Sequence, residues 1–472
     1  MAIVVLLLLF AAVLVLRALT VKGRPLGEKK HHCSDEQAQA YARQLSGMLA
    51  CETVSRKDSY DDAEFAKLRA VMEAEFPLVH SRCERMVFGE DCWVFRLPGK
   101  DPSRNIMLMS HHDVVKAEGK WKYPPFSGTV AEGKIWGRGA VDTKTPLFAE
   151  FAALEELLRR GYEPVCNVYI ASSHNEEIAG SGIPLANDYF KEQGITFELI
   201  LDEGGGVIDP PIGGMACEKC AMTAIHEKGR HKVKLTASQA MSHTNLLPGK
   251  TCSPTEQMAA FITDVSRKNG FIRRLNPLVK GMLEAMAPYA AFPMKLILAN
   301  LWCFGPVLTR ILPKLSSQAG GLLGTTVSFR NLSCPDSNCC TAEAMLRSVY
   351  DTDFEKDLQW LTETAEKYGI TLEKTDDWEY HPPADPTMPA FAVVERCIGE
   401  IFPEVPVIPF ILPAGTDART LTDVCPCVVR FAPIRLSKAQ LASVHSVDEN
   451  MDLAAVGDCV AFYRRLLEQY ER

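Results

Sequence analysis

The feature that most constrains the fold is an alternation of short buried-strand patterns and amphipathic helix patterns that begins near Ser34. Strands without polar alternation, separated by helices, are typical of an α/β domain whose central sheet is mostly parallel. The predicted strands are Ile106–Ser110, Val168–Ser172 and Leu199–Leu201, and the predicted helices are Thr145–Arg160 and Ile183–Gln193.

The pattern changes after residue 228 and returns near Pro389. Strand-like pieces at Val233–Thr236 and Thr325–Phe329, with a helix at Phe354–Tyr368, indicate an inserted α+β module. The main domain is therefore predicted to be discontinuous. The predicted division is a membrane anchor at 1–22, a linker at 23–33, a catalytic domain at 34–228 and 379–472, and the inserted module at 229–378.

The N-terminus is uninterruptedly apolar from Met1 to Leu16. At ~1.5 Å per residue this is about 24 Å, and roughly 30 Å if the span extends to Val21, so it predicts a membrane-spanning helix. A cleaved signal peptide would carry a basic n-region, but no charged side chain precedes Arg17. Basic residues then follow the span, which predicts a single-pass protein with its body in the cytoplasm; the extracytoplasmic orientation stays open.

A second apolar segment lies at Pro293–Leu312. Lys295, Pro306 and Arg310 interrupt it, so the prediction is a buried or groove-lining helix rather than a second span.

Composition excludes one class of partner. There are 51 Lys and Arg against 59 Asp and Glu, a net charge of −8, with no segregated basic patch, so nucleic acid is not expected. Sixteen cysteines without a repeating spacing predict free thiols in a reducing compartment. Cys217 and Cys220 form a Cys-x-x-Cys that matches half of a zinc ribbon or a redox pair, but no second pair follows at ribbon spacing.

Acidic and imidazole side chains cluster directly after predicted strands or tight turns, where open α/β sheets place their sites. The clusters are Ser110-His111-His112-Asp113, Gly137-Arg138-Gly139-Ala140-Val141-Asp142, His174-Asn175-Glu176-Glu177 and Leu201-Asp202-Glu203-Gly204. Together they supply the carboxylate oxygens and imidazole nitrogens with which zinc or a similar divalent ion performs hydrolysis.

In this order, with a late His-x-x-x-Glu at His445 and Glu449, the motifs resemble the dinuclear-zinc peptidases. That family includes aminoacylase, bacterial glutamate carboxypeptidase, acetylornithine deacetylase and succinyl-diaminopimelate desuccinylase. The resemblance runs from about Ser34 to the C-terminus. It implies that the inserted module is a lid and dimerisation domain, and that the protein is a homodimer.

The resemblance also implies a ligand set for two zinc ions per subunit, for which cobalt or manganese can substitute. His111 and Asp202 would bind one ion, Glu177 and His445 the other, and Asp142 would bridge both. Asp113 would orient the His111 imidazole, and Glu176 would act as the general base.

The resemblance implies a functional role for three further residues, and for each the sequence leaves a second interpretation open or departs from the family's pattern. His243 resembles the lid histidine that reaches the neighbouring subunit's site, or is an exposed loop histidine, since the usual Gly-His-Ser-Ser is altered here. Arg419, in a Gly-Thr-Asp loop, would bind the substrate carboxylate or form an internal salt bridge. Arg347 is a second candidate for substrate binding, without the family's preceding Asn and Pro element.

The N-terminal anchor and Phe292–Leu312 resemble the carboxypeptidase-S-like branch and its relatives that hydrolyse N-fatty-acyl amino acids. The predicted activity is metal-dependent cleavage of the amide bond of N-acyl amino acids or short peptides with a free carboxylate. The alternatives are a dipeptidase, a small-acyl deacetylase, or a membrane-tethered binding protein without turnover. Glu176 argues against the last, because binding alone needs no base.

Overall fold

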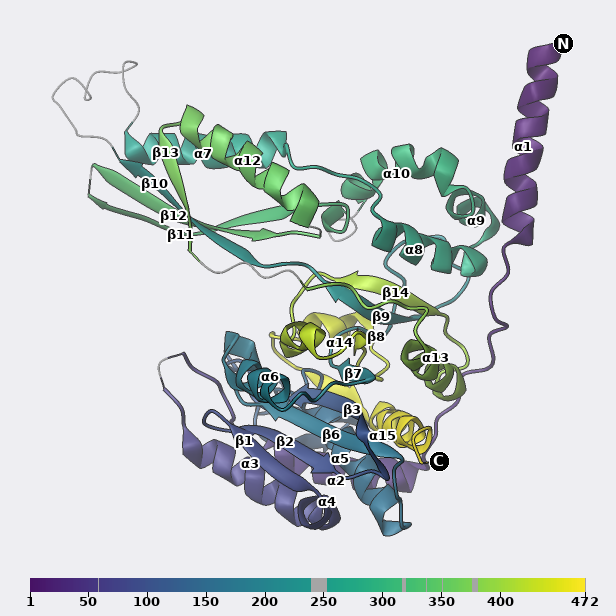
Figure 1. Cartoon of the computed structure of the whole chain (residues 1–472), viewed down its shortest axis with the longest axis vertical. Coiled ribbons are helices and arrows are strands. Elements are labelled where there is room, and N and C mark those ends of the chain that lie inside the picture. Colours follow the sequence, from purple (N-terminus) through teal and green to yellow (C-terminus); the bar gives the residue numbers. More distant parts are fainter. Residues whose placement is uncertain are drawn as a thin grey trace.

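A nine-stranded sheet runs through the lower part of the molecule in Figure 1. The computed structural model describes residues 1–57, 59–238, 253–315, 320–336, 338–349, 351–375 and 381–471, and in it the strand order is β1-β2-β6-β3-β7-β15-β9-β14, with β8 beside β9. The strands are β1 Glu84–Phe88, β2 Cys92–Leu97, β3 Asp101–His111, β6 Cys166–Ser173, β7 Leu199–Asp202, β8 Gly206–Ile208, β9 Cys220–Glu227, β14 Val407–Leu412 and β15 Val428–Arg430.

This sheet is mixed, which corrects the prediction of a mostly parallel one. At its centre β3 pairs in parallel with β6 and β7, and β15 pairs in parallel with β7. The β1–β2 hairpin adds an antiparallel edge, and β8 and β15 both run antiparallel to β9. Hairpins at the margins of a parallel centre are a common way to build a large sheet.

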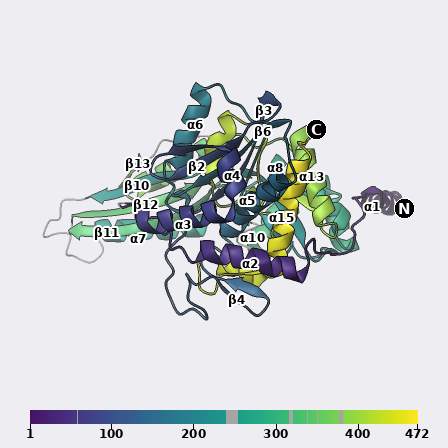
Figure 2. The ribbon, with the colours of Figure 1, turned by 90° about the horizontal axis from the view of Figure 1, so that it is seen from below.

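Helices cover both faces of the sheet. On one face α5 Lys144–Arg159 packs with α15 Leu453–Glu468 and α2 Asp35–Leu49, and on the other α6 Gly182–Glu192 packs against β1 and β2 (Figure 2). The predicted central strands lie in β3, β6 and β7, and the two predicted helices are α5 and α6. The remaining helices of this part are α3 Asp62–Glu75, α4 Pro77–Arg82, α13 Pro389–Ile401 and α14 Lys438–Ser443.

A second, antiparallel sheet in the order β11-β12-β10-β13 lies above the first in Figure 1. Helices α7 and α12 pack on it around a separate apolar core that includes Phe261 and Phe354. Its elements are β10 His231–Ser238, α7 Pro254–Lys268, β11 Thr326–Asp336, β12 Cys339–Arg347, α12 Asp351–Lys367 and β13 Ile370–Lys374. The predicted strands and helix of the inserted module are β10, β11 and α12.

A small third sheet joins β5 Lys134–Trp136 to β4 Thr129–Ala131 and β16 Asn450–Asp452. The pairing sets Asn450 opposite Trp136. It therefore brings the loop after β5 beside the loop before β16, although the two are about 300 residues apart in the chain.

Helix α1, Ala2–Thr20, projects from the body in Figures 1 and 2. It is long and apolar enough to cross a membrane, and a signal sequence passes the same test. The expected single helix in the second apolar segment is instead two helices, α9 Phe292–Leu298 and α10 Leu301–Leu315, which meet at 103° beside α1. They follow α8 Pro277–Met286 and the short η3 Ala287–Tyr289, and α8 packs on β14.

The segment between α1 and α2 is fastened to the body. Arg24 donates through its guanidinium to the backbone oxygens of Pro403 and Val405. Farther on, the His32 backbone N–H donates to Asp458, a buried carboxylate that also pairs with Arg435.

Candidate metal centre

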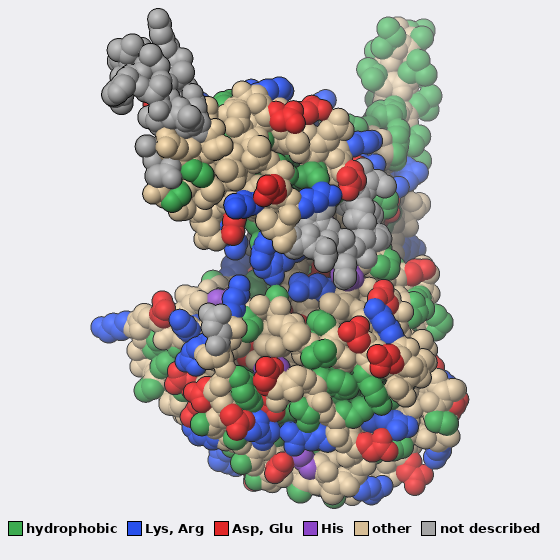
Figure 3. Space-filling view, turned by 60° about the vertical axis from the view of Figure 1, so that its left-hand side comes forward, with side chains coloured by type: hydrophobic (Ala, Val, Ile, Leu, Met, Phe, Trp, Pro, Cys, Tyr) green, Lys and Arg blue, Asp and Glu red, His purple; other side chains and the backbone are tan. Residues whose placement is uncertain are grey.

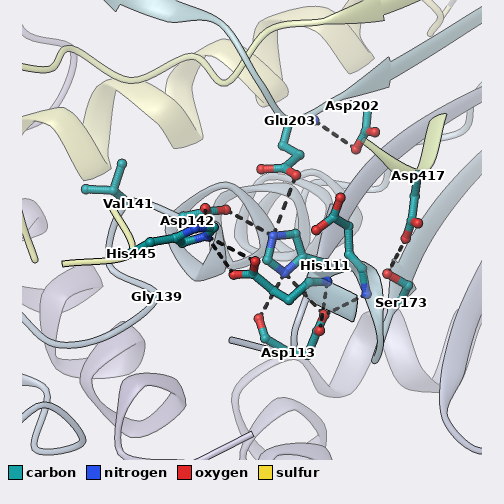
Figure 4. A network of polar contacts seen from close by, with 12 residues as sticks. His111, Asp113, Gly139, Val141, Asp142, Ser173, Asp202, Glu203, Asp417 and His445 are labelled. Carbon is teal, nitrogen blue, oxygen red and sulfur yellow. Dashed lines mark hydrogen bonds and ion pairs between the residues drawn. The ribbon is translucent and has the colours of Figure 1, made fainter. Parts of the chain in front are cut away.

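The carboxyl ends of the parallel strands assemble the centre. Strand β3 ends at His111, opposite Ser173 at the end of β6. The His111 imidazole is buried, and its Nε2 lies 3.0 Å from Asp142 Oδ1 and 3.6 Å from Glu203 Oε1 (Figure 4). His111, Asp142 and Glu203 therefore offer three donor atoms to one point, and these lie within 4.8 Å of one another.

A second group shares Asp142 with the first. Asp142 Oδ2 lies 3.1 Å from His445 Nε2, and that nitrogen lies 3.0 Å from Glu177 Oε2. The two oxygens of Asp142 thus face different histidines, as a bridging carboxylate would. Within the described residues these are the two groups of His, Cys, Asp and Glu that could hold an ion, and neither includes Cys217 or Cys220, whose sulfurs are 3.7 Å apart.

The donor group around His111 contains Glu203, whereas the resemblance implies its neighbour Asp202 as a ligand. Asp202 Oδ1 accepts from the Glu203 backbone N–H at 2.8 Å, and Oδ2 accepts from the Ala418 N–H at 3.1 Å. Asp202 therefore holds the loop that contains Thr416, Asp417 and Ala418. Successive side chains at a strand end point in opposite directions, so only one of the two acids can face His111.

Asp113 contacts both donor groups, His111 of the first and the Glu177 backbone of the second. Its backbone oxygen lies 2.9 Å from His111 Nδ1 and its Oδ1 lies 3.3 Å from the same nitrogen. The Asp113 carboxylate also accepts from the backbone N–H groups of Glu176 and Glu177, at 3.2 and 3.1 Å. It thereby positions η1, Glu176–Ile178, against the imidazole.

The charges of the centre fit a divalent cation. Burial raises the pKa of Glu176 to about 9, and the carboxylates of Asp417, Asp113 and Asp142 add to the rise while His111 opposes it. Burial and Asp142 likewise hold the pKa of Glu203 well above its usual range. Hydrogen bonds that His445 donates to the carboxylates of Asp142 and Glu177 raise the pKa of His445 to about 10. Buried carboxylates that cannot all ionise alone would be compensated by cations, and imidazole with carboxylate is a set that zinc accepts.

Glu449, the last residue of the His-x-x-x-Glu motif, links the loop that contains Asp142 to the loop that contains His445. Its buried carboxylate accepts from the backbone N–H groups of Gly139, Val141 and Asp142, at 3.1, 2.7 and 3.0 Å. It also pairs with Arg138 at 2.6 Å, and Arg138 donates to the Ser446 oxygen. The four-residue spacing from His445 was the signal available in the sequence.

Two other buried carboxylates were missed. Asp417 accepts a short hydrogen bond from Ser173, and burial raises its pKa to about 7. Glu227, at the end of β9, accepts from the Thr416 N–H at 2.9 Å and from Arg430 Nε at 2.6 Å. Both fix the Gly-Thr-Asp loop beside the centre.

A cationic cavity of about 440 Å³ adjoins the centre and opens between the two sheets, where Figure 3 shows Lys and Arg side chains gathered in a cleft. Ile178, which directly follows Glu177, lies in its wall, as do Arg419 and Arg430. The other lining residues include Lys57, His226, Lys228, Arg230, Lys232 and His381.

Arg347 lies close enough to Arg419 and Arg230 for their charges, after burial, to lower its pKa. Its Nη1 is buried and has no hydrogen-bond partner within the described part of the chain. The structure thus brings both predicted substrate-binding arginines together. His243 lies outside the described residues.

These features define a metal-dependent hydrolase: two histidine and carboxylate groups that share one aspartate, a candidate base beside them, and a cationic cavity. The model of peptidase family M20/M25/M40 matches residues 107–469, and the chain belongs to this family.

The proteins that the chain resembles agree with this class. The chain is 28% identical to the N-fatty-acyl-amino acid synthase/hydrolase PM20D1 of Xenopus tropicalis over 90% of this chain and 84% of that one. It is 27% identical to the probable carboxypeptidase S-like 2 of Dictyostelium discoideum over 91% and 85% of the two chains. The M20 metallo-carboxypeptidase Sso-CP2 of Sulfolobus solfataricus has the same fold, with a TM-score of 0.65 and 16% identity over 93% of this chain and all of that one.

Proposed function

We propose that this enzyme is a two-zinc amidohydrolase that cleaves N-acyl amino acids or short peptides with a free C-terminal carboxylate. The observation that carries the proposal is the pair of donor groups that share Asp142, next to a cavity lined by cations. One ion would be held by His111, Asp142 and Glu203, and the other by Asp142, Glu177 and His445. Cobalt or manganese are the expected substitutes for zinc.

Glu176 is the proposed general base. When bound, the two ions would lower the pKa of the attacking water and polarise the scissile carbonyl. Glu176 then takes the proton of the attacking water and delivers it to the leaving amine as the tetrahedral intermediate collapses. Asp113 contacts both the His111 imidazole and the backbone of Glu176, so it would hold these two groups in place during the reaction.

The cationic cavity is the proposed seat of the substrate carboxylate. Arg347, which lies near Arg419 but does not line the cavity, is one candidate, since its buried Nη1 has no partner in the described residues and a guanidinium binds a carboxylate through two parallel hydrogen bonds. Arg419, in the wall, is the second candidate. An apolar acyl group would then extend from the centre on the side away from the cationic cavity, because it lies on the other side of the scissile amide from the carboxylate.

The proposal includes the organisation of the chain. Residues 34–228 and 379–472 form the catalytic domain, and residues 229–378 form a lid and dimerisation domain from which α8 to α10 branch to pack beside β14 and α1. His243 would complete the neighbouring subunit's site in a homodimer. Residues 1–22 anchor the protein in a membrane as a single span, and the basic residues that follow favour a cytoplasmic body.

The test is hydrolysis of a panel of N-acyl amino acids and dipeptides by the full chain in detergent with added zinc. Glu176→Gln keeps the size of the side chain, and we expect it to retain metal while turnover falls by about 10²–10⁴-fold. Glu192→Gln, an exposed carboxylate at the end of α6, is the matched control and should be unchanged. A metal-loaded wild type that binds every member but cleaves none would favour a binding protein. Cleavage of dipeptides alone would favour a dipeptidase.

A further inference from the structure

The corner formed by α9 and α10 is built against α1 rather than beside the active site. The α9–α10 pair is apolar enough to pass for a broken membrane span or a re-entrant loop, and it packs on the one helix of the described chain that could cross a membrane alone. Leu14, one of the two buried residues of α1, lies at this contact.

The contact is specific. Asn300, at the bend, is fully buried, and its Nδ2 donates to the backbone oxygens of Leu14 and Leu296 at 3.0 and 2.9 Å. Its Oδ1 accepts from Trp302 Nε1 at 3.2 Å. The Trp302 ring meets Phe10 of α1 edge-on, with centroids 5.9 Å apart. Every polar group of the Asn300 amide is therefore satisfied without water, which is the condition that a hydrocarbon environment imposes.

The position of this contact along α1 indicates how deep the corner would lie in a bilayer. Leu14 and Phe10 precede the end of α1 at Thr20 by six and ten residues. At ~1.5 Å per residue these contacts lie about 9 and 15 Å from that end. A helix of 19 residues has barely enough length for a ~30 Å hydrocarbon layer, so all of it must be immersed if it spans. A corner packed half-way along it is then immersed as well.

The outer surface of the corner has the composition expected of a surface in the bilayer, with exposed apolar residues and basic side chains near them. Phe292, Trp302, Val307 and Ile311 are exposed and apolar. Basic side chains accompany them, at Lys295, Arg310 and Lys314, and long basic side chains can extend to lipid headgroups while their stems stay in apolar surroundings.

We propose that the α9–α10 corner enters one leaflet of the bilayer beside α1 and forms a second membrane contact. The inference rests on the proposed anchor. Its occupant is lipid, because the exposed apolar face of the corner continues the exposed face of α1. Through α8, which packs on β14, the corner connects the membrane to the strand that leads into the Gly-Thr-Asp loop.

The experiment is depth-dependent quenching of tryptophan fluorescence by phosphatidylcholine with brominated acyl chains, with the full chain reconstituted in vesicles. Of the six tryptophans, we expect Trp302 to account for most of the quenching, so Trp302→Phe should remove most of it. Trp121→Phe, on the catalytic body, is the matched control and should leave the quenching in place. Hydrolysis by each variant reports that it is folded.

Two outcomes would overturn the inference, and they are distinguishable. If carbonate extraction releases the full chain from the vesicles, α1 is not a membrane anchor, and the proposed insertion of the α9–α10 corner is refuted as well. If the chain resists extraction but Trp302→Phe leaves the quenching unchanged, the anchor stands and the corner lies outside the bilayer, as it would in a contact between two copies of the chain.

Discussion

Replacing Glu449 by Gln tests how the two ligand loops are held. The Glu449 carboxylate accepts four hydrogen bonds: Oε1 from the N–H groups of Val141 and Asp142, and Oε2 from the Gly139 N–H and Arg138. Glutamine has the same shape, but its amide nitrogen must point a donor at two of these donors. It also removes the negative charge that faces the buried Arg138 guanidinium.

The magnitude follows from these contacts. Each buried donor left without an acceptor costs about 1–3 kcal/mol, and breaking a buried ion pair costs about 3–5 kcal/mol. The two costs overlap because they concern the same carboxylate, so we expect Glu449→Gln to lower the free energy of unfolding by about 3–5 kcal/mol. Because the Asp142 backbone loses its support, metal affinity should also fall by about 10–100-fold.

Urea unfolding of the full chain in detergent measures the first quantity, and metal titration measures the second. Glu118→Gln, on the surface, is the control. In the double variant Arg138→Met with Glu449→Met, no unpaired charge remains, so its stability loss should be smaller than the sum of the single losses. The reasoning is refuted if the free energy of unfolding of Glu449→Gln lies within about 1 kcal/mol of the wild-type value and the variant binds metal as tightly as wild type.

Three further predictions concern the centre and the cavity. By elemental analysis, Glu203→Gln should contain one bound ion in place of two, whereas Asp202→Asn should contain both. If only Asp202→Asn lost an ion, the ligand would be Asp202, as the resemblance implies. Burial lowers the pKa of Lys228 to about 7, so the unfolded chain binds the extra proton between pH 7 and about 10.5, and stability should rise through this window by up to about 1 kcal/mol per pH unit. Thermal unfolding of Lys228→Met should lack that part of the rise, and an unchanged pH profile would contradict it. Chelation should abolish hydrolysis, and the metal-free protein should lose stability as pH rises from about 4.5 toward 9, because the raised pKa of Glu176 makes the folded state bind more protons than the unfolded one; equal melting temperatures at pH 5 and pH 8 would contradict this.

The central fold was predictable because its strands are buried on both faces. The runs at Ile106–Ser110 and Val168–Ser172 have no polar alternation, and only a covered sheet accepts such strands. The edges were not predictable in the same way. The β1–β2 hairpin and β8 depend on which strand they pair with, and pairing is a tertiary choice that a local pattern does not record.

The site residues also divide into those that local motifs predict and those that tertiary contacts determine. His111, Asp142, Glu177 and His445 converge in the structure; the first three lie at or after a strand end or a tight turn, as the motifs indicated, and His445 lies in the turn after α14. Between Asp202 and Glu203 the choice depends on which way the chain leaves β7, and the Ala418 N–H that captures Asp202 comes from a loop 216 residues away. The Asn300 contact with Leu14 spans 286 residues and was equally invisible to local patterns.

The fastening of residues 23–33 to the body has a kinetic consequence. Because Arg24 and His32 are bonded to the catalytic body directly after α1, the proposed membrane anchor would hold that body through a short, rigid connection and not through a flexible linker. The cleft would keep one height and one angle above the lipid, and the body could not rotate to sample solution on every side. Amphiphilic substrates that diffuse laterally in the plane of the membrane would then meet the cleft in one preferred orientation, whereas soluble ones would have only the uncovered side of the body by which to approach.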